Sequence, residues 1–588
     1  MKWIFLVIFG VLTLCSYWIY ATLPEQETSK PVIYWVTDRN PARNQQVDLF
    51  HDWMAKNHPD KDVLLLLDMG NRDGQKQIIQ GVSGVGADVQ DTYHGVQVRL
   101  YHSMGIVEHL TEQAKELGFG LDQTYPALAT ELTVTVDGET EQVAFPCNVA
   151  NARYIFNEGL LREVGFPAPP ESWTIEKFEA YGKAFVEKAN ADNPTRRRFV
   201  ARDIPLDVLY RSYGIDLFNE TLTGAGIDDY ALTPDGLATE RGYVRALELT
   251  YKWQRVDRIM PTASEIAAMN TEGGYGGAAL ASFERGDFLI SNSGRWELIK
   301  MRETNKLRVR RLETKLDGLA DAGYPRLRDI WEAQGVVALF DEIERLEASG
   351  VVFDQALRPD PLADGPLVLN TVQYPYRFLP NAALGTRAAV VYTGSDHKEL
   401  ATLFLAFLAS EEYNANIVAD ADGLPPNPAY TDSEAFLRPA EDPDLGVYSE
   451  TEWKLHEAWL DDVQGIAIGK TYSPYVLYRE AERELGRPRD EFYEGIGTVE
   501  RAADLSAARL DRLIATNVSK LEPDDPLRDQ YAEGLETQKK IDALKAAGKP
   551  IPAEWISNPF FTRYYREIGM LDESGSAIET PAVETETH

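Results

Sequence analysis

The spacing of apolar residues in the first hundred positions predicts an α/β unit. A strand-like stretch at 31–38 is followed by a helical pattern at 40–59 and by a continuous apolar run at 63–67. A second helical pattern at 75–82 then leads to the edge of a further strand at 87–89. Continuous apolar runs are typical of strands buried on both faces, and their alternation with helices favours a parallel sheet.

The middle of the chain continues with mixed elements. Residues 131–146 alternate as in a β-hairpin, with Asp137 and Gly138 at the turn. A helix is expected over 171–189, and residues 279–303 read as helix, short strand and helix.

Helical patterns dominate the later segments. Residues 303–350 are rich in charge and helical in spacing, which predicts an inserted helical hairpin. Residues 398–418 and about 500–545 are also expected to be helical. The tail after Leu571 is rich in Glu, Thr and Ser and is expected to be disordered.

An uncharged apolar run of nineteen residues, Trp3–Ala21, follows Lys2. This length can cross a hydrocarbon core as a helix, and the preceding positive charge predicts export of the rest of the chain. Three interpretations remain open: an uncleaved anchor, cleavage after Ala21, or lipidation on Cys15. Residues 22–30 read as a polar tether.

Composition narrows the classes of function. The chain has 59 Lys and Arg against 93 Asp and Glu, a net charge of −34, so no nucleic-acid partner is expected. Its two cysteines, Cys15 and Cys147, form no CxxC pair, and the histidines miss the usual zinc spacings, so no metal or other cofactor is expected. The glycines of GVSGVGAD (81–88) end a helix and match no phosphate-binding loop.

Five stretches, in order and spacing, resemble the family 1 extracellular solute-binding proteins, the group of maltose-binding protein. The third stretch carries a crossing strand, then an aromatic residue and Asn, a Gly, a Pro-rich turn and a Trp-Thr helix start. Together they span about two-thirds of the chain. The five stretches are 32–59, 76–93, 145–185, 283–298 and 385–414.

The resemblance implies an α/β fold of the two-lobed, periplasmic-binding-protein-like type II class, a clamp here extended by added helical segments and a C-terminal helical extension. The length beyond that usual in the family assigns 303–370 and the chain after about 440 to these additions. The expected division is anchor or signal peptide plus tether 1–30, lobe 1 31–146, lobe 2 147–289, return to lobe 1 with the insert 290–385, lobe 2 remainder with the extension 386–571, and acidic tail 572–588.

Several ligand contacts are expected where strands end toward the cleft, because ligands of open α/β sheets bind at the carboxyl ends of strands. Asp38 and Arg39 follow the first strand, although Asp38 can equally cap the next helix. Asp91 and Tyr93 follow the third strand, with a plain loop as the alternative. Asn148 stands where the chain crosses between lobes, and it can instead satisfy hinge backbone.

A second group of expected contacts comes from later segments. Tyr275 is flanked by glycines that allow close approach of a ligand. Arg295 and Trp296 follow Gly294, where the resemblance implies an aromatic platform for a sugar ring. Arg387 and Tyr475 are weaker candidates.

The function implied is capture of a mono- or oligosaccharide and its delivery to the permease of an ABC transporter, without catalysis. The protein is expected to be a monomer, periplasmic or on the cell surface, and tethered to the inner membrane by residues 3–21. A binding component of a membrane sensor and an exported glycoside hydrolase are the alternatives. Arg39, Arg295 and Arg387 also leave room for an acidic sugar such as a uronate.

Overall fold

The computed structural model describes residues 30–136, 138–191, 197–269 and 277–573. The predicted apolar segment 3–21, the tail 574–588 and the candidate contact Tyr275 therefore lie outside the described residues. Within the described residues, no helix is long and apolar enough to span a membrane.

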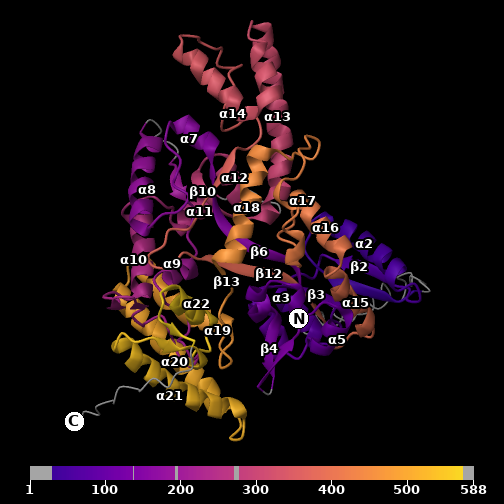
Figure 1. The fold of residues 1–588 in the computed structure, drawn as a ribbon, viewed down its shortest axis with the longest axis vertical. Coiled ribbons are helices and arrows are strands. Elements are labelled where there is room, and N and C mark those ends of the chain that lie inside the picture. Colours follow the sequence, from indigo (N-terminus) through magenta and orange to yellow (C-terminus); the bar gives the residue numbers. More distant parts are fainter. Residues whose placement is uncertain (1–29, 137, 192–196, 270–276, 574–588) are drawn as a thin grey trace, which may run out of the picture.

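A nine-stranded mixed sheet runs through the molecule in the order β2-β1-β3-β12-β6-β10-β7, with β11 added on β6 and β13 on β12 (Figure 1). β1 pairs in parallel with β2 and β3, which confirms the predicted opening α/β unit. The strands are β1 Val32–Val36, β2 Leu64–Asp68, β3 Val89–Tyr93, β6 Phe145–Asn157, β7 Phe199–Ala201, β10 Phe288–Gly294, β11 Leu369–Val372, β12 Ala382–Val391 and β13 Ala467–Ile468.

Two long antiparallel strands join the lobes. β6 has 13 residues and β12 has 10, and they pair from Leu384 opposite Asn151 to Ala389 opposite Phe145. β12 also pairs with β3 on one side, while the second half of β6 pairs with β10 and β11. Both strands therefore cross the boundary between lobes, as the two-lobed prediction requires.

The first lobe is covered by helices from two distant parts of the chain. Trp35 of β1 packs against Phe404 with ring centroids 4.8 Å apart. Phe404 lies on α15 (Lys398–Leu408), which shares one core with α2 (Ala42–Asn57) and α16 (Glu411–Asp420). This packing differs from the predicted division, which placed residues 386–571 in the second lobe and its extension. The reason is that an apolar helical pattern alone does not specify which lobe the helix covers.

The second lobe is built around a large aromatic core. Phe178 of α8 (Ile175–Asn190) packs edge-on against Trp253 of α10 (Gly242–Arg255), with ring centroids 5.1 Å apart. Trp173 is fully buried in the same core, in agreement with a packing role at the helix start.

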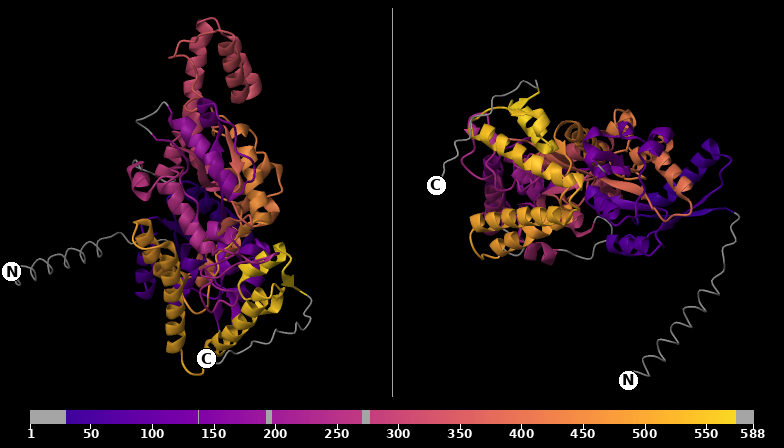
Figure 2. Two further views of the ribbon diagram at one scale, coloured as in Figure 1. Left: turned by 90° about the vertical axis from the view of Figure 1, so that its left-hand side faces the viewer. Right: turned by 90° about the horizontal axis from the view of Figure 1, so that it is seen from below.

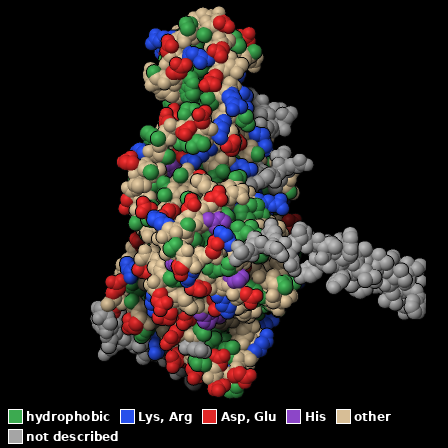
Figure 3. Space-filling view, turned by 90° about the vertical axis from the view of Figure 1, so that its right-hand side faces the viewer, with side chains coloured by type: hydrophobic (Ala, Val, Ile, Leu, Met, Phe, Trp, Pro, Cys, Tyr) green, Lys and Arg blue, Asp and Glu red, His purple; other side chains and the backbone are tan. Residues whose placement is uncertain are grey.

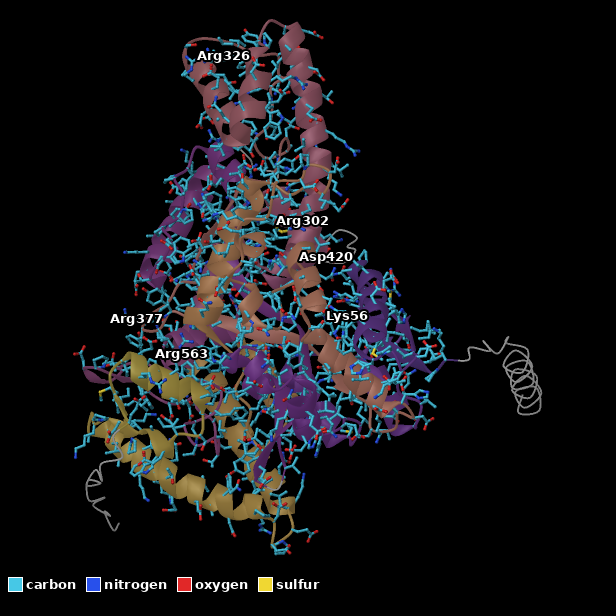
Figure 4. The ribbon with its side chains drawn as sticks, turned by 45° about the vertical axis from the view of Figure 1, so that its right-hand side comes forward. Lys56, Arg302, Arg326, Arg377, Asp420 and Arg563 are labelled. Atoms are coloured by element: carbon cyan, nitrogen blue, oxygen red, sulfur yellow. The ribbon has the colours of Figure 1, made fainter. Side chains whose placement is uncertain are left out.

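The charged insert is a helical hairpin that projects from the body of the molecule, at the top of Figure 1 and of the left view in Figure 2. It consists of α13 (Leu298–Asp321) and α14 (Arg326–Ala348), which confirms the prediction, and its helices share a small core of their own. At its base Arg302 donates to both carboxylate oxygens of Glu452 at 2.7 and 2.8 Å, and Figure 4 shows it beside Asp420.

Four helices at the C-terminal end pack on the second lobe, at the lower end of Figure 1. They are α19 Tyr478–Tyr493, α20 Val499–Lys520, α21 Pro526–Ala546 and α22 Pro559–Glu567. Lys545 of α21 donates to Glu220 of the second lobe at 2.9 Å, and Tyr565 of α22 donates to the same carboxylate at 2.5 Å. The predicted helical region 500–545 thus corresponds to α20 and α21.

The remaining elements complete the two lobes. β4 (Thr133–Val136) and β5 (Glu139–Gln142) form the predicted hairpin. The other helices are α3 Gly74–Val82, α4 His94–Ser103, α5 Thr111–Leu117, α6 Ala129–Leu132, α7 Glu158–Val164, α9 Leu206–Ser212, α11 Ala263–Met269, α12 Gly277–Glu284, α17 Glu434–Leu437 and α18 Ser449–Gly465, with short strands β8 Leu232–Thr233, β9 Gly236–Leu237, β14 Ile551–Pro552 and β15 Leu571–Asp572. Acidic side chains spread over the face shown in Figure 3, with basic ones interspersed.

Candidate ligand-binding cleft

A cavity of about 400 Å³ lies where the crossing strands β6 and β12 meet the carboxyl end of β3. Its volume is in the range of small-molecule sites. Side chains from widely separated parts of the chain line it: Asp38, Arg72, Tyr93, His94, Asn148, Ala150, Trp296, Thr386, Arg387 and Asp422.

Five of the ten residues expected from the sequence line this one cavity: Asp38, Tyr93, Asn148, Trp296 and Arg387. They come from segments about 350 residues apart in the chain. Their contact with a ligand stays a prediction, but the fold does bring them to one place.

Two buried arginines organise the charged side of the cavity. Arg387 donates to Asp91 Oδ2 at 2.7 Å and lies 3.4 Å from Asp422 Oδ2. Arg43 donates to Asp422 Oδ2 at 2.5 Å and to Asp38 Oδ1 at 3.0 Å. Asp91 therefore lies behind the cavity wall as a partner of Arg387.

These ion pairs keep the carboxylates ionised. Burial by itself raises the pKa of Asp38, but the charges of Arg387 and Arg43 outweigh it and lower the pKa to about 2. The pKa of Asp422 is also lowered against the effect of burial, by Arg43 and Arg387. The cavity thus presents fixed hydrogen-bond acceptors at neutral pH.

Two polar groups at the cavity keep hydrogen-bonding capacity. Arg387 Nε is buried and bonds no described residue. Asn148 Nδ2 donates to the backbone oxygen of Asp422 at 2.7 Å, and no described residue donates to its Oδ1. Because buried polar groups are normally satisfied, a ligand hydroxyl is a natural partner for both.

Trp296 forms the apolar side of the cavity. It follows β10 directly, and its ring lies over Gly294, where an added Cβ would come 1.9 Å from the ring. Only glycine therefore permits this indole position. The ring is partly exposed and lines the cavity, as a platform for a sugar face requires.

Sequence reasoning missed four polar residues of the lining. Arg72 follows β2, so the strand-end rule that selected Asp38 applies to it as well. His94 has a backbone φ of 61°, and its ring occupies the space that a side chain at position 385 would need, where the chain has glycine. Desolvation lowers the pKa of His94. The sequence around Thr386 and Asp422 does not indicate that they line the cavity. Thr386 is placed there by its bond to the backbone oxygen of Asn148, and Asp422 by its ion pair with Arg43.

The other expected residues lie elsewhere. Arg39 is exposed and does not line the cavity. Arg295 is buried and donates to the carbonyl oxygens of Ile417, Val418 and Gly423, so it supports the backbone next to Asp422. Tyr475 packs against Tyr531 of the C-terminal helices, with ring centroids 5.1 Å apart.

Among the residues that the structure describes, no three His, Cys, Asp or Glu side chains are grouped to hold a metal ion. Cys147 is buried, and burial raises its pKa well above the usual range. The Cys147 side chain therefore packs in the interior as a thiol and not as a reactive thiolate.

No family model matches the chain, and no curated protein matches it by sequence. Solved structures do match it in fold. An ABC substrate-binding protein from Listeria monocytogenes in complex with cycloalternan is 15% identical, with TM-score 0.56, over 83% of this chain and 100% of that one. A solute-binding protein from Thermotoga lettingae bound to α-D-tagatose is 14% identical, with TM-score 0.53, over 82% and 100%.

The acarbose-binding receptor GacH of Streptomyces glaucescens is a third such structure, 14% identical, with TM-score 0.53, over 83% of this chain and 99% of that one. All three are described as binding proteins or receptors. At this level of identity the likeness concerns the fold. The chain has the two-lobed α/β fold of the solute-binding proteins of ABC transporters.

Proposed function

We propose that this protein captures a carbohydrate in the cavity between its lobes and delivers it to an ABC transporter. The observation that carries the proposal is the composition of the cavity: Trp296 on one side and a charged, hydrogen-bonding rim of Asp38, Asn148, Arg387 and Asp422 on the other. A sugar presents apolar C–H faces and a rim of hydroxyls, which match these two sides.

The charges at the site favour a neutral sugar. Asp38, Asp91 and Asp422 supply three negative charges, and Arg43, Arg72 and Arg387 supply three positive charges. Arg295 is left out of this charge count because its guanidinium donates to backbone carbonyl oxygens of the protein itself. An acidic sugar such as a uronate would leave this balance with one excess negative charge, and we expect it to bind more weakly than its neutral counterpart.

Closure of the lobes is the expected consequence of binding. A ligand shifts the equilibrium toward a closed form only by its differential affinity for that form. Because β6 and β12 cross between the lobes, a small change in these strands changes the lobe angle. We propose that a permease recognises the closed form, outside the cytoplasm, and that residues 3–21 tether the protein to the membrane.

Thermal unfolding in the presence of sugars tests the proposal. A ligand that binds only the folded state stabilises it by RT ln(1 + [L]/Kd), about 2.7 kcal/mol at a hundredfold excess over Kd. We expect a shift of several degrees with one group of neutral mono- or oligosaccharides, and a smaller shift with the matching uronates. Binding of amino acids or polyamines but of no sugar would contradict the carbohydrate assignment, and turnover of a glycoside would favour an enzyme.

A further inference from the structure

A second cavity of about 400 Å³ lies between the first lobe and the C-terminal helices. α4 and β4 form one wall, and the segment 472–477 with α20 and α21 forms the other. Figure 1 shows β4 beside α19 and α20 at the lower end of the molecule. The cavity shares no lining residue with the cleft.

The positively charged side chain that lines this cavity is Arg99. Its guanidinium carbon lies 3.8 Å above the ring centroid of Tyr472. It forms no hydrogen bond or ion pair with any described residue, and its Nη1 is buried. Burial lowers the pKa of Arg99, against the opposing effect of Tyr472 and Glu131. Arg99 is half-buried, and a buried guanidinium nitrogen without an acceptor is costly, so a bound anion would remove that cost.

The nearest carboxylate is occupied by other donors. Glu131 accepts hydrogen bonds from the backbone nitrogens of Gly95 and Lys470 and from Tyr472 Oη, the last at 2.8 Å. Glu131 therefore joins the start of α4 to the segment that leads into the C-terminal helices. Its oxygens do not reach Arg99.

The remaining polar lining is mixed. His102 lies one turn after Arg99 and its Nε2 is 3.2 Å from His109 Nε2, while Glu480 is on the opposite wall. Burial, His109 and Arg99 lower the pKa of His102, so its ring is neutral at pH 7. Other walls are apolar: Val134, Leu222, Tyr475, Val476, Leu477 and Leu527.

We propose that this cavity is a second ligand site, which takes a small organic anion with a carboxylate or phosphate head. The head bonds Arg99, and an apolar or aromatic body lies against Tyr475 and Leu527. Bidentate contact with carboxylate or phosphate is the geometry that a guanidinium favours. The site is separate from the sugar cleft and does not depend on the function proposed for that cleft.

Isothermal titration of the full-length protein at pH 7 tests this site with two anions, benzoate and phenyl phosphate, and with neutral benzyl alcohol of similar size. We expect at least one of the anions to bind ten or more times tighter than benzyl alcohol. Arg99→Gln is expected to remove this preference, and Arg99→Lys to keep part of it. Arg479→Gln, which changes an exposed arginine of α19 outside the lining, is the matched control and is expected to bind like the wild type.

The proposal is overturned if neither anion binds better than benzyl alcohol, or if Arg99→Gln binds the anions as the wild type does. Circular dichroism of each variant checks that it is folded. Should Arg99→Gln fail to fold, the comparison of anions with benzyl alcohol on the wild type still decides the outcome. Sugar-induced stabilisation, measured in parallel, reports on the cleft alone.

Discussion

The tautomer of His456 is fixed by its two partners. Arg295 Nε donates to His456 Nδ1 at 3.1 Å, so this nitrogen is an acceptor and Nε2 carries the proton, 3.1 Å from Glu452 Oε2. Burial and the charge of Arg295 lower its pKa to about 4, although Glu452 opposes the shift. The three side chains connect the start of α13 with α18.

The free energy of unfolding is therefore expected to decrease as the pH is lowered. The unfolded chain takes up a proton at His456 near pH 6.5, but the folded protein does so only near pH 4. As the pH falls from 7.5 to 5, this histidine alone removes about 2 kcal/mol of unfolding free energy. Urea denaturation of the wild type and His456→Gln measures it as the difference in their pH dependence. An identical dependence in both would refute this role. His397→Gln is the control, because His397 lies at the start of α15 and contacts neither Arg295 nor Glu452; this variant should keep the pH dependence of the wild type.

Trp296 is expected to be the strongest single contact for the sugar. Trp296→Ala removes the apolar side of the cavity and should weaken sugar binding by about 1–3 kcal/mol, which is the range of a buried aromatic anchor. Trp331→Ala on the hairpin is the control, since Trp331 does not line the cavity. Titration calorimetry with the best sugar measures both, and unchanged affinity in folded Trp296→Ala would rule out the assignment.

The sequence predicts the cleft residues that follow a strand. It misses those that reach the cleft only through contacts with distant parts of the chain. Asp38 and Tyr93 come directly after β1 and at the end of β3, so a local rule selects them. Asp422 follows α16 and reaches the site through Arg43, whose partner cannot be read from local spacing. Arg295 has the right position in the chain, but its side chain turns into the core.

At the scale of elements, the hairpin α13–α14 contains a break that glycine makes possible. Gly335 interrupts α14 with φ 84° and ψ −177°, a conformation close to exclusive to glycine. An added Cβ would also lie 2.3 Å from Glu450 Oε1. The break lets α14 bend and keeps its apolar residues on the core of the hairpin.

Gly335→Ala is therefore expected to lower the unfolding free energy by about 1–3 kcal/mol, the typical cost of such backbone strain. Sugar affinity should not change, because the hairpin does not line the cleft. Gly465→Ala in α18 is the control: its added Cβ meets no atom within 4 Å, so it should be neutral or stabilising. Equal stability of the two variants in urea would show that the break stores no strain.

One buried carboxylate of the second lobe, Glu220, binds both α21 and α22. Glu220 accepts from Lys545 of α21, Gln538 and Tyr565 of α22, and its pKa is lowered although burial raises it. Lys545→Met leaves this charge without its main partner and is expected to cost about 3–5 kcal/mol. Thermal or urea unfolding measures the loss. The double variant Glu220→Gln/Lys545→Met should recover most of it, and failure to recover would contradict the ion-pair explanation.

Which elements form was easier to predict than how they pack. Apolar periodicity predicts the opening strands and helices and the hairpin helices, because these signals are local. The assignment of α15 and α16 to the second lobe was wrong in its packing, since both helices share the core of β1 and α2. That choice depends on contacts between residues nearly 370 positions apart, such as Trp35 and Phe404.

At the scale of the whole molecule, the first lobe is assembled from two distant parts of the chain. β3 needs β12 as its antiparallel neighbour, and the core of β1 is completed by Phe404 and Ile417. The second lobe also depends on late segments, because the helices α20 to α22 close its core. Neither lobe is a continuous piece of sequence.

This connectivity has a consequence for biosynthesis. β3 ends at residue 93 and β12 begins at residue 382, so at about 5–20 residues per second β3 waits roughly 15–60 seconds for its partner to be synthesised. During that time the nascent chain cannot complete a native lobe. A delay of this kind leaves the first lobe incomplete until β12 has been made, so its native folding is expected to follow synthesis of most of the chain rather than to accompany it.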